Sequence, residues 1–344
     1  MDKKIVVAGM LLPELSEVIT KMGEPGFRAK QIMEWVFKKN TLSFERMSNL
    51  SAALRQSLDA SMQVVSLRES RSVVSADKTV KYLFQTRDNN VIESVFLPES
   101  KRATLCLSTQ VGCAFGCTFC ASGANGLARD LSADEIVSQV LLIKNANPDT
   151  PLTNIVIMGM GEPLANYEQT LKAVRIMNSP DCIGIAARKI TISTCGLPKE
   201  IMRLVKEGIQ VELSVSLHAA DDELRTSLMP VNKKYPLFEL MNTAKEYIRQ
   251  TNRIITFEYV LIKGVNDRKE DAQRLAALLS RIKCKVNFIT LNELEDRKMF
   301  TSSPKEIEEF KQILDKRGIH YTFRRKRGRD IQAACGQLRM AHSS

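Results

Sequence analysis

Three closely spaced cysteines are the residues of this sequence best suited to chemistry. Cys113, Cys117 and Cys120 form a CxxxCxxC motif. Three thiolates at this spacing can bind three irons of a [4Fe-4S] cluster and leave the fourth iron open to a small molecule. A structural zinc site usually takes four ligands, and the chain's three histidines offer no CxxH-type pair: His218, His320 and His342. The motif therefore favours a cluster, with a zinc site or buried thiols as alternatives.

The elements around the motif predict an α/β fold. Strand-like runs are found at 104–108, 154–158, 189–193, 210–216, 254–261, 285–290 and 319–323. Helical periodicity fills the intervals, for example at 132–145, 167–177, 237–249 and 272–282. Such alternation predicts a parallel sheet, open or closed into a barrel, with ligand sites at the carboxyl ends of its strands.

The first hundred residues have a different organisation. Residues 1–70 read as a basic helical domain, and residues 71–103 as a β-hairpin whose turn is Asp88-Asn89-Asn90. Residues 104–344 form the α/β domain. No run approaches the ~20 apolar residues that a membrane-spanning helix needs.

Several motifs together resemble one family. CxxxCxxC after the first strand of an α/β domain is similar to the signature of radical S-adenosylmethionine (SAM) enzymes. Five further segments resemble the radical SAM methyltransferases that methylate adenosine in RNA, the RlmN and Cfr type: Phe27–Gln31, Gly159–Pro163, Ser193-Thr194, Ser216–His218 and Ala333–Leu338. The resemblance extends over nearly the whole chain.

This resemblance implies a partial (β/α)6-type barrel with a small N-terminal helical domain and a β-hairpin extension. It implies a [4Fe-4S] cluster on Cys113, Cys117 and Cys120, and two SAM molecules per turnover. The SAM contacts would come from strand ends: Gly161, Glu162, Ser193, Ser216, Leu217, His218 and Asn292. We interpret the glycines before Glu162 as room for the backbone to approach SAM; a plain strand-end turn is the alternative.

The resemblance also implies a two-cysteine mechanism. One SAM methylates Cys335, and a 5′-deoxyadenosyl radical from the second takes hydrogen from that methyl group. The carbon adds to adenine as a covalent RNA adduct, Glu93 accepts the ring proton, and Cys106 resolves the adduct by forming a disulfide with Cys335. Considered alone, each has a structural alternative: a buried Cys335, a core Cys106 and a solvent-facing Glu93.

The charge balance fits an RNA partner. The chain has 50 Lys and Arg against 39 Asp and Glu, a formal net charge of +11. Basic residues gather at 324–329, beside Cys335, and at Arg28, Lys30, Lys38 and Lys39. Phosphate binding is one interpretation of these runs, and a solvated face is the other.

The family implies 23S rRNA and tRNA as substrates, an electron donor such as flavodoxin, a monomer and a cytoplasmic location. Methylation at adenine C2 is expected, and the alternatives are a Cfr-type C8 enzyme, a non-methylating radical SAM enzyme and a zinc-bearing RNA-binding module. Two positions depart from the family pattern, because Cys195 replaces a common serine and Gln332 a common acidic residue. Cys182, Cys195 and Cys284 have no predicted role.

Overall fold

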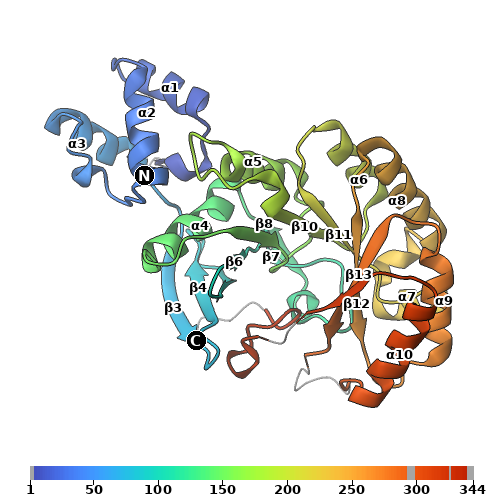
Figure 1. The fold of residues 1–344 in the computed structure, drawn as a ribbon. Helices are drawn as coiled ribbons and strands as arrows, with labels where there is room; N and C mark the ends of the chain where they lie inside the picture. Colours follow the sequence, from blue (N-terminus) through green and yellow to red (C-terminus); the bar gives the residue numbers. More distant parts are fainter. Residues whose placement is uncertain (1–3, 293–298, 325–326, 339–344) are drawn as a thin grey trace.

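One ten-stranded sheet organises the molecule. The computed structural model describes residues 4–292, 299–324 and 327–338. Within these ranges the sheet has the order β14-β13-β12-β11-β10-β9-β6-β5-β4-β3 (Figure 1). Its parallel strands are β6 (Ala103–Cys106), β9 (Asn154–Ile157), β10 (Ile190–Thr194), β11 (Glu212–Ser216), β12 (Ile255–Leu261), β13 (Cys284–Thr290) and β14 (Tyr321–Phe323). In the described part of the chain β14 and β3 are its unpaired edges, so the barrel is partial.

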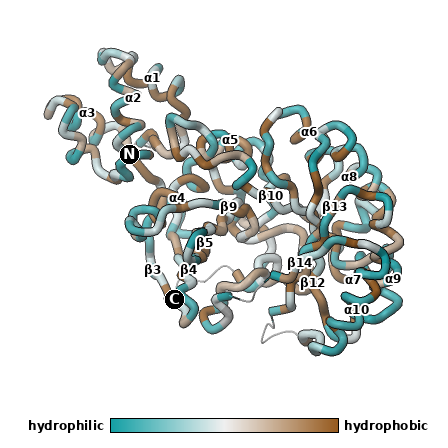
Figure 2. Tube along the Cα trace, in the orientation of Figure 1, coloured by the Kyte–Doolittle hydropathy of each residue, from teal (hydrophilic) through white to brown (hydrophobic). Residues whose placement is uncertain are grey.

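Helices connect the parallel strands and cover the outer side of the sheet (Figure 1). They are α4 (Ala133–Ala146), α5 (Tyr167–Asn178), α6 (Pro198–Lys206), α7 (Asp222–Leu228), α8 (Leu237–Thr251), α9 (Lys269–Leu279) and α10 (Pro304–Lys316). Their inward faces are apolar and their outer faces hydrophilic, as the colours of Figure 2 show. Every residue of β9 and β12 is shielded from solvent, whereas β13 and β14 nearer the edge are only partly buried. The predicted α/β fold with a parallel sheet is therefore confirmed.

An antiparallel extension continues the sheet beyond β6. It consists of β5 (Val91–Pro98), β4 (Val80–Gln85) and β3 (Arg68–Val74). The turn between β4 and β5 contains Asn89 at φ 63°, a left-handed conformation that Asn tolerates. The sequence predicted the β4–β5 hairpin and not β3, whose side chains are nearly all exposed and so lack an apolar alternation.

The N-terminal segment forms a separate helical layer, drawn in blue in Figure 1. It contains α1 (Leu12–Lys21), α2 (Phe27–Met33), a π-helical turn η2 (Glu34–Lys38) and α3 (Ala52–Ser61). A short parallel pair, β1 (Ile5–Val6) with β2 (Met62–Gln63), joins its ends. Leu15, Ile19, Ile32, Leu54 and Leu58 form its core. This layer contacts the barrel through the hydrogen bond from Lys144 Nζ on α4 to the Phe37 carbonyl oxygen.

The cysteine motif lies within a second small hairpin. β7 (Gln110–Gly112) pairs with β8 (Leu127–Asp130), and the motif occupies the loop between them. Short 3-10 turns complete the chain: η1 (Val7–Gly9), η3 (Phe44–Arg46), η4 (Ala121–Gly123), η5 (Ala187–Lys189), η6 (Pro230–Lys233) and η7 (Arg329–Ile331). Among the described residues no helix is long and apolar enough to cross a membrane.

Candidate active site

The β7–β8 hairpin holds the cysteine loop in a tight conformation. The Cys113 amide donates a 2.9 Å hydrogen bond to the Gly126 carbonyl, and the Cys120 amide donates to the Cys117 carbonyl at 3.1 Å. Gly112 has φ 82°, and a Cβ there would lie 2.1 Å from the Gly126 carbonyl oxygen. Only glycine fits this close approach, so the loop geometry depends on it.

The three thiols face one cavity at the carboxyl ends of the strands. This cavity measures about 970 Å³ including its open mouth, and Cys113, Cys117 and Cys120 all line it. It is called the larger cavity below, because a smaller one adjoins it. Burial and the neighbouring thiols raise the pKa of Cys113 to about 11 and that of Cys117 further, as expected for sulfurs close together. Among the described residues no three His, Cys, Asp or Glu side chains converge on a point that would hold one metal ion. Thiolates that each bind a different iron of a cluster need no such convergence, and the site therefore fits a cluster.

Strand ends supply the rest of this cavity. Of the residues predicted to contact SAM, six line it and Leu217 does not: Gly161, Glu162, Ser193, Ser216, His218 and Asn292 do. Leu217 is fully buried, and its amide donates to the Glu258 carbonyl at 3.0 Å. β11 ends at Ser216, and His218 has φ 58°, a left-handed conformation, so its ring faces the cavity from a turn and not from an extended strand.

The glycines before Glu162 allow a close approach between two segments of the chain. A Cβ on Gly159 would lie 2.6 Å from the Leu107 carbonyl oxygen, and one on Gly161 would lie 2.5 Å from Gln110 Cβ. The segment after β9 thus packs closely on the segment after β6. Both glycines also line the larger cavity, so an approach of their backbone to SAM stays a prediction. Gly161 also has φ 102°, a conformation that other residues rarely adopt.

Glu162 is a buried carboxylate with internal partners. Its Oε2 accepts a 2.7 Å hydrogen bond from the Cys195 amide, and its Oε1 accepts one of 3.0 Å from the Leu164 amide. Burial raises its pKa, which these hydrogen bonds oppose. Each carboxylate oxygen has further lone pairs, so Glu162 can still accept a donor from the cavity. Cys195, for which the sequence suggested no role, lines the same cavity.

His218 is held as a neutral ring. Its Nδ1 accepts a 2.9 Å hydrogen bond from the Val260 amide, which assigns the proton to Nε2. Burial and the nearby Arg225 cation lower the pKa of His218 to about 3. The ring therefore offers an N–H donor, and no positive charge, at neutral pH.

Arg225 braces the strand ends, and sequence patterns gave no sign of it. This side chain is fully buried. Its Nη2 donates to the carbonyl oxygens of Cys195 and Ser216 at 2.9 and 3.1 Å, and its Nε donates to that of Leu217 at 3.2 Å. The hydrophobic periodicity of α7 does not reveal this role, because the partners of Arg225 lie at or just after the ends of β10 and β11, outside that helix.

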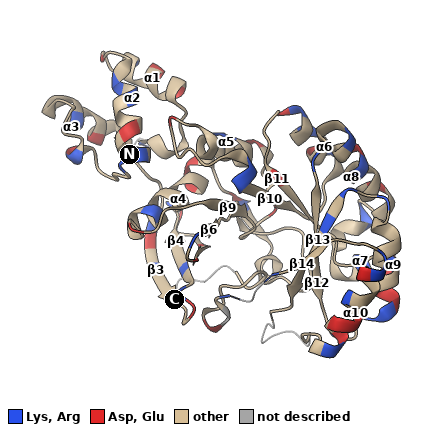
Figure 3. Ribbon diagram, in the orientation of Figure 1, with Lys and Arg blue, Asp and Glu red and all other residues tan. Residues whose placement is uncertain are grey.

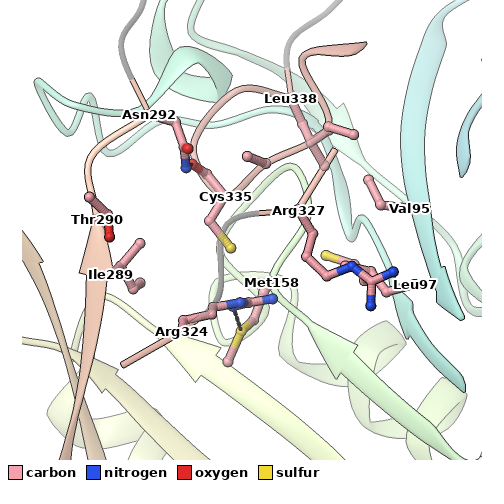
Figure 4. A pocket seen from close by; sticks show the side chains of 13 residues that line it. Val95, Leu97, Met158, Ile289, Thr290, Asn292, Arg324, Arg327, Cys335 and Leu338 are labelled. Carbon is pink, nitrogen blue, oxygen red and sulfur yellow. Dashed lines mark hydrogen bonds between the residues drawn. The ribbon is translucent and has the colours of Figure 1, made fainter. Parts of the chain in front are cut away.

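Cys106 and Cys335 meet in a second, smaller cavity. This cavity of about 530 Å³ is lined by both cysteines and by Met158, Asn292 and Arg324. Figure 4 labels Cys335 and these last three residues. Cys335, Met158, Asn292 and Arg324 also line the larger cavity. The two spaces therefore share a wall, and Cys335 belongs to both.

The Cys335 segment is fastened to the cysteine loop. The Ala121 amide donates to the Gly336 carbonyl at 2.7 Å, and the Ser122 hydroxyl donates to the Leu338 carbonyl at 2.6 Å. From the other side, Asn292 Nδ2 donates to the Cys335 carbonyl at 3.1 Å. Asn292 Oδ1 is buried without a hydrogen-bond partner among the described residues. This buried acceptor on the wall of both cavities is therefore available to a donor that enters either of them.

Arg324 provides the positive charge beside the two cysteines. Burial raises the pKa of Cys106 to about 12 and raises that of Cys335, and the Arg324 cation opposes both shifts. One guanidinium nitrogen of Arg324 lies 3.5 Å from Met158 Sδ, the dashed line in Figure 4.

Glu93 lies near this wall without lining either cavity. It is on β5, two residues from Val95, which does line the smaller cavity. Its Oε1 lies 3.1 Å from Lys81 Nζ on β4. Cys182 and Cys284 line neither of the two cavities.

The basic run at 324–329 has internal partners where it is described. Arg324 lines both cavities, and Arg327 pairs with Asp77 at 3.4 Å and Glu99 at 3.2 Å. Neither arginine therefore belongs to a plain solvated face, and phosphate binding by this run stays a prediction. Arg325, Lys326 and His342 lie outside the described residues.

The N-terminal basic residues are exposed. Lys30 on α2, Lys38 at the end of the π-helical turn and Lys39 after it are exposed, and Figure 3 colours the basic residues of this layer blue along the ribbon. Phe27 beside them is 58% exposed, with the Arg28 guanidinium 4.9 Å from its ring centre. Cations interleaved with an exposed aromatic ring suit contact with nucleic acid.

Comparisons with known proteins agree with this geometry. Residues 107–276 match the family model described as the radical SAM superfamily, and residues 7–64 match that of the ribosomal RNA large subunit methyltransferase N-terminal domain. A protein of Thermoanaerobacter sp. (strain X514), named a probable dual-specificity RNA methyltransferase RlmN, is 46% identical, with 96% of each chain covered. A protein of the same name from Alkaliphilus oremlandii is 45% identical over 99% of each chain.

A solved structure extends the likeness to the fold. The crystal structure of a radical SAM methyltransferase from Sphaerobacter thermophilus superposes with a TM-score of 0.94 at 44% identity. It covers 97% of this chain and 99% of its own.

Proposed function

Because this chain belongs to the RlmN family of radical SAM RNA methyltransferases, we propose that it methylates C2 of an adenosine in 23S rRNA and in tRNA. The position of Cys335 carries the proposal. It is the cysteine shared by the cavity of the CxxxCxxC thiols and the cavity of Cys106. A residue that takes a methyl group from one ligand and passes it to another must face both.

In this proposal Cys113, Cys117 and Cys120 hold a [4Fe-4S] cluster, and the strand-end residues hold SAM. When bound together, these groups supply a carbon radical that removes hydrogen from an unactivated methyl group. Glu162, Ser193, Ser216, His218 and the unpaired Asn292 Oδ1 offer the acceptors and donors that an amino acid moiety and a ribose require. The Leu217 side chain packs in the core and does not face this cavity.

Cys335 would first react as a thiolate with the SAM methyl group, and the Arg324 cation favours that ionised form. After the methyl carbon is bonded to adenine, the Cys106 sulfur attacks the Cys335 sulfur. A disulfide forms as the sulfur–carbon bond breaks, the bond's electron pair stays with the methylene carbon, and this carbon takes up a proton from solvent to become the methyl group of the released base. Glu93 accepts the ring proton in this scheme.

RNA would reach the site over the exposed basic residues of the N-terminal layer. We propose the divisions 1–70, 71–103 and 104–344 as RNA-binding domain, hairpin extension and catalytic domain. The target adenosine must leave its stack to reach Cys335, because this cysteine is only partly exposed at the bottom of a cavity. A flavodoxin-type electron donor, a monomeric state and a reducing cytoplasm complete the proposal, since the disulfide must be reduced after each turnover.

The decisive measurement is mass spectrometry of RNA from cells with and without this protein. We expect 2-methyladenosine only when the chain is present, and its loss in Cys335→Ala. Cys182→Ala is the matched control, because that thiol is buried away from both cavities. Finding 8-methyladenosine instead would make the chain a C8 enzyme, and finding neither would contradict methylation.

The cysteine roles have a separate test. Cys106→Ala should trap a covalent protein–RNA adduct, because the resolving sulfur is gone. If the purified variant carries no RNA, the two-cysteine scheme fails.

A further inference from the structure

Lys81 and Glu93 lie on the sheet face that carries Cys106. Four residues are aligned across neighbouring strands: Lys81 on β4, Val95 on β5, Cys106 on β6 and Val156 on β9. Residues directly opposite each other in a sheet share a face, and so do residues two apart on one strand. Glu93 therefore shares this face, because it lies two residues before Val95 on β5.

The two charged side chains form a shielded ion pair. Lys81 Nζ lies 3.1 Å from Glu93 Oε1, and the side chains are 12% and 5% exposed. The same ammonium group donates to the Gln332 carbonyl at 3.4 Å, three residues before Cys335. Lys81 thus joins a carboxylate of the hairpin extension to the backbone of the segment that carries Cys335.

The two arginines that line the smaller cavity have other partners. Arg327 pairs with Asp77 and Glu99, and Arg324 acts on the two cysteines and on Glu258. Lys81 is a cation in direct contact with Glu93. A buried ion pair contributes little to stability compared with apolar residues of the same volume, so its presence beside a reaction cavity suggests another purpose.

We infer that Lys81 is a positioning residue that keeps the Glu93 carboxylate ionised and aimed at the RNA adduct on Cys335. This inference rests on the proposed function, in which Glu93 accepts the ring proton. In that step the ring C–H bond breaks, its electron pair stays in the purine, and the proton moves to a Glu93 oxygen. A buried carboxylate without a cation would take up a proton from solvent and lose the ability to accept this one.

The test compares Lys81→Met, which keeps the length and removes the charge, with Lys81→Arg, which keeps the charge. Each full-length variant is purified with its cluster and given SAM, a reductant and an RNA transcript. We expect Lys81→Met to lower the kcat for methyladenosine by about tenfold or more, as loss of general-base function does. Its KM for RNA and its formation of 5′-deoxyadenosine should stay within about twofold of the unaltered chain, and covalent RNA adduct should accumulate. Lys81→Arg should restore most of the rate.

The double variant Lys81→Met/Glu93→Gln separates positioning from a structural role. If Lys81 acts through Glu93, the double variant is no slower than Glu93→Gln alone. Lys78→Met, an exposed lysine of the adjoining turn, is the matched control and should behave as the unaltered chain. Should Lys81→Met fail to fold, Lys81→Gln takes its place with the same expected pattern.

Three results would overturn the inference: an unchanged kcat in Lys81→Met, equal losses of 5′-deoxyadenosine and methyladenosine, or additive losses in the double variant. Failure of the proposed function has a different signature, since Cys106→Ala in the otherwise unaltered chain would then trap no RNA.

Discussion

The Asn292 side chain holds the backbone of Cys335: its Nδ2 donates a 3.1 Å hydrogen bond to the Cys335 carbonyl oxygen. Asn292 was expected to contact SAM, and it lines both cavities. Its amide nitrogen faces the Cys335 segment, and its amide oxygen has no hydrogen-bond partner among the described residues. Asn292 therefore contacts the Cys335 backbone and also faces any ligand that binds in the larger cavity.

Replacing Asn292 should therefore slow methylation of Cys335. In Asn292→Ala the carbonyl loses its partner, and we expect a loss of about tenfold, the equivalent of one hydrogen bond of ~1.4 kcal/mol. Mass spectrometry of the Cys335 peptide after a timed incubation with SAM gives the rate. Asn178→Ala removes a similar amide-to-carbonyl bond, to Ile185 on the outer side of the sheet, and should leave that rate unchanged. Equal rates in all three chains would show that Asn292 does not position Cys335.

Two glycines of the cysteine hairpin should differ in their tolerance of alanine. Gly112→Ala would bring a Cβ to 2.1 Å from the Gly126 carbonyl oxygen, so the loop must distort. Gly126→Ala meets nothing within 4 Å and costs only the left-handed conformation, about 1–2 kcal/mol. We expect Gly112→Ala to lose most of its bound iron after anaerobic reconstitution and Gly126→Ala to keep it, measured by iron content per chain and by absorbance. Retained iron in Gly112→Ala would contradict the geometry of this loop.

The thiolate of Cys335 should depend on pH and on Arg324. Burial raises the pKa of this thiol, so its ionised fraction, and with it the rate of methylation by SAM, should increase as the pH rises above neutrality. The charged and titratable groups that act on it are Arg324, which lowers its pKa, and Glu258 and Cys120, which raise it. Arg324→Met should shift the midpoint of the pH–rate curve to higher pH.

The control for this shift is Arg327→Met. The Arg327 charge is paired with Asp77 and Glu99, so its removal should leave the midpoint in place. A midpoint that moves to lower pH in Arg324→Met, or does not move, would show that Arg324 does not stabilise the thiolate.

Sequence patterns predicted the parts of the structure whose signals are local. The parallel strands, the helices between them and the β4–β5 hairpin follow from periodicity and turn residues. β3 was missed because its residues are exposed on both faces, and β7 and β8 because three or four residues show no period.

The site itself was only partly predictable. The spacing of Cys113, Cys117 and Cys120 is a local feature, and strand ends are where ligand sites gather. The contacts of Arg225, Lys81 and Arg324 join segments distant in sequence, and no pattern within one segment reports them. The basic run at 324–329 shows the same limit. Arg324 and Arg327 look alike in the sequence, but Arg324 lines both cavities and Arg327 pairs with Asp77 and Glu99.

The fastening of the Cys335 segment has a consequence for the pace of the reaction. Hydrogen bonds from Ala121, Ser122 and Asn292 hold this segment on rigid neighbours, and Asp330 binds the Ser75 hydroxyl and the Ala76 amide in the turn after β3. Because the backbone of this segment is held on both sides, the Cys335 sulfur in the proposed reaction would turn from one cavity to the other by rotation of its own side chain. Such a rotation takes picoseconds to nanoseconds. We therefore expect turnover to be limited by bond making or by RNA release, and not by the opening and closing of a loop.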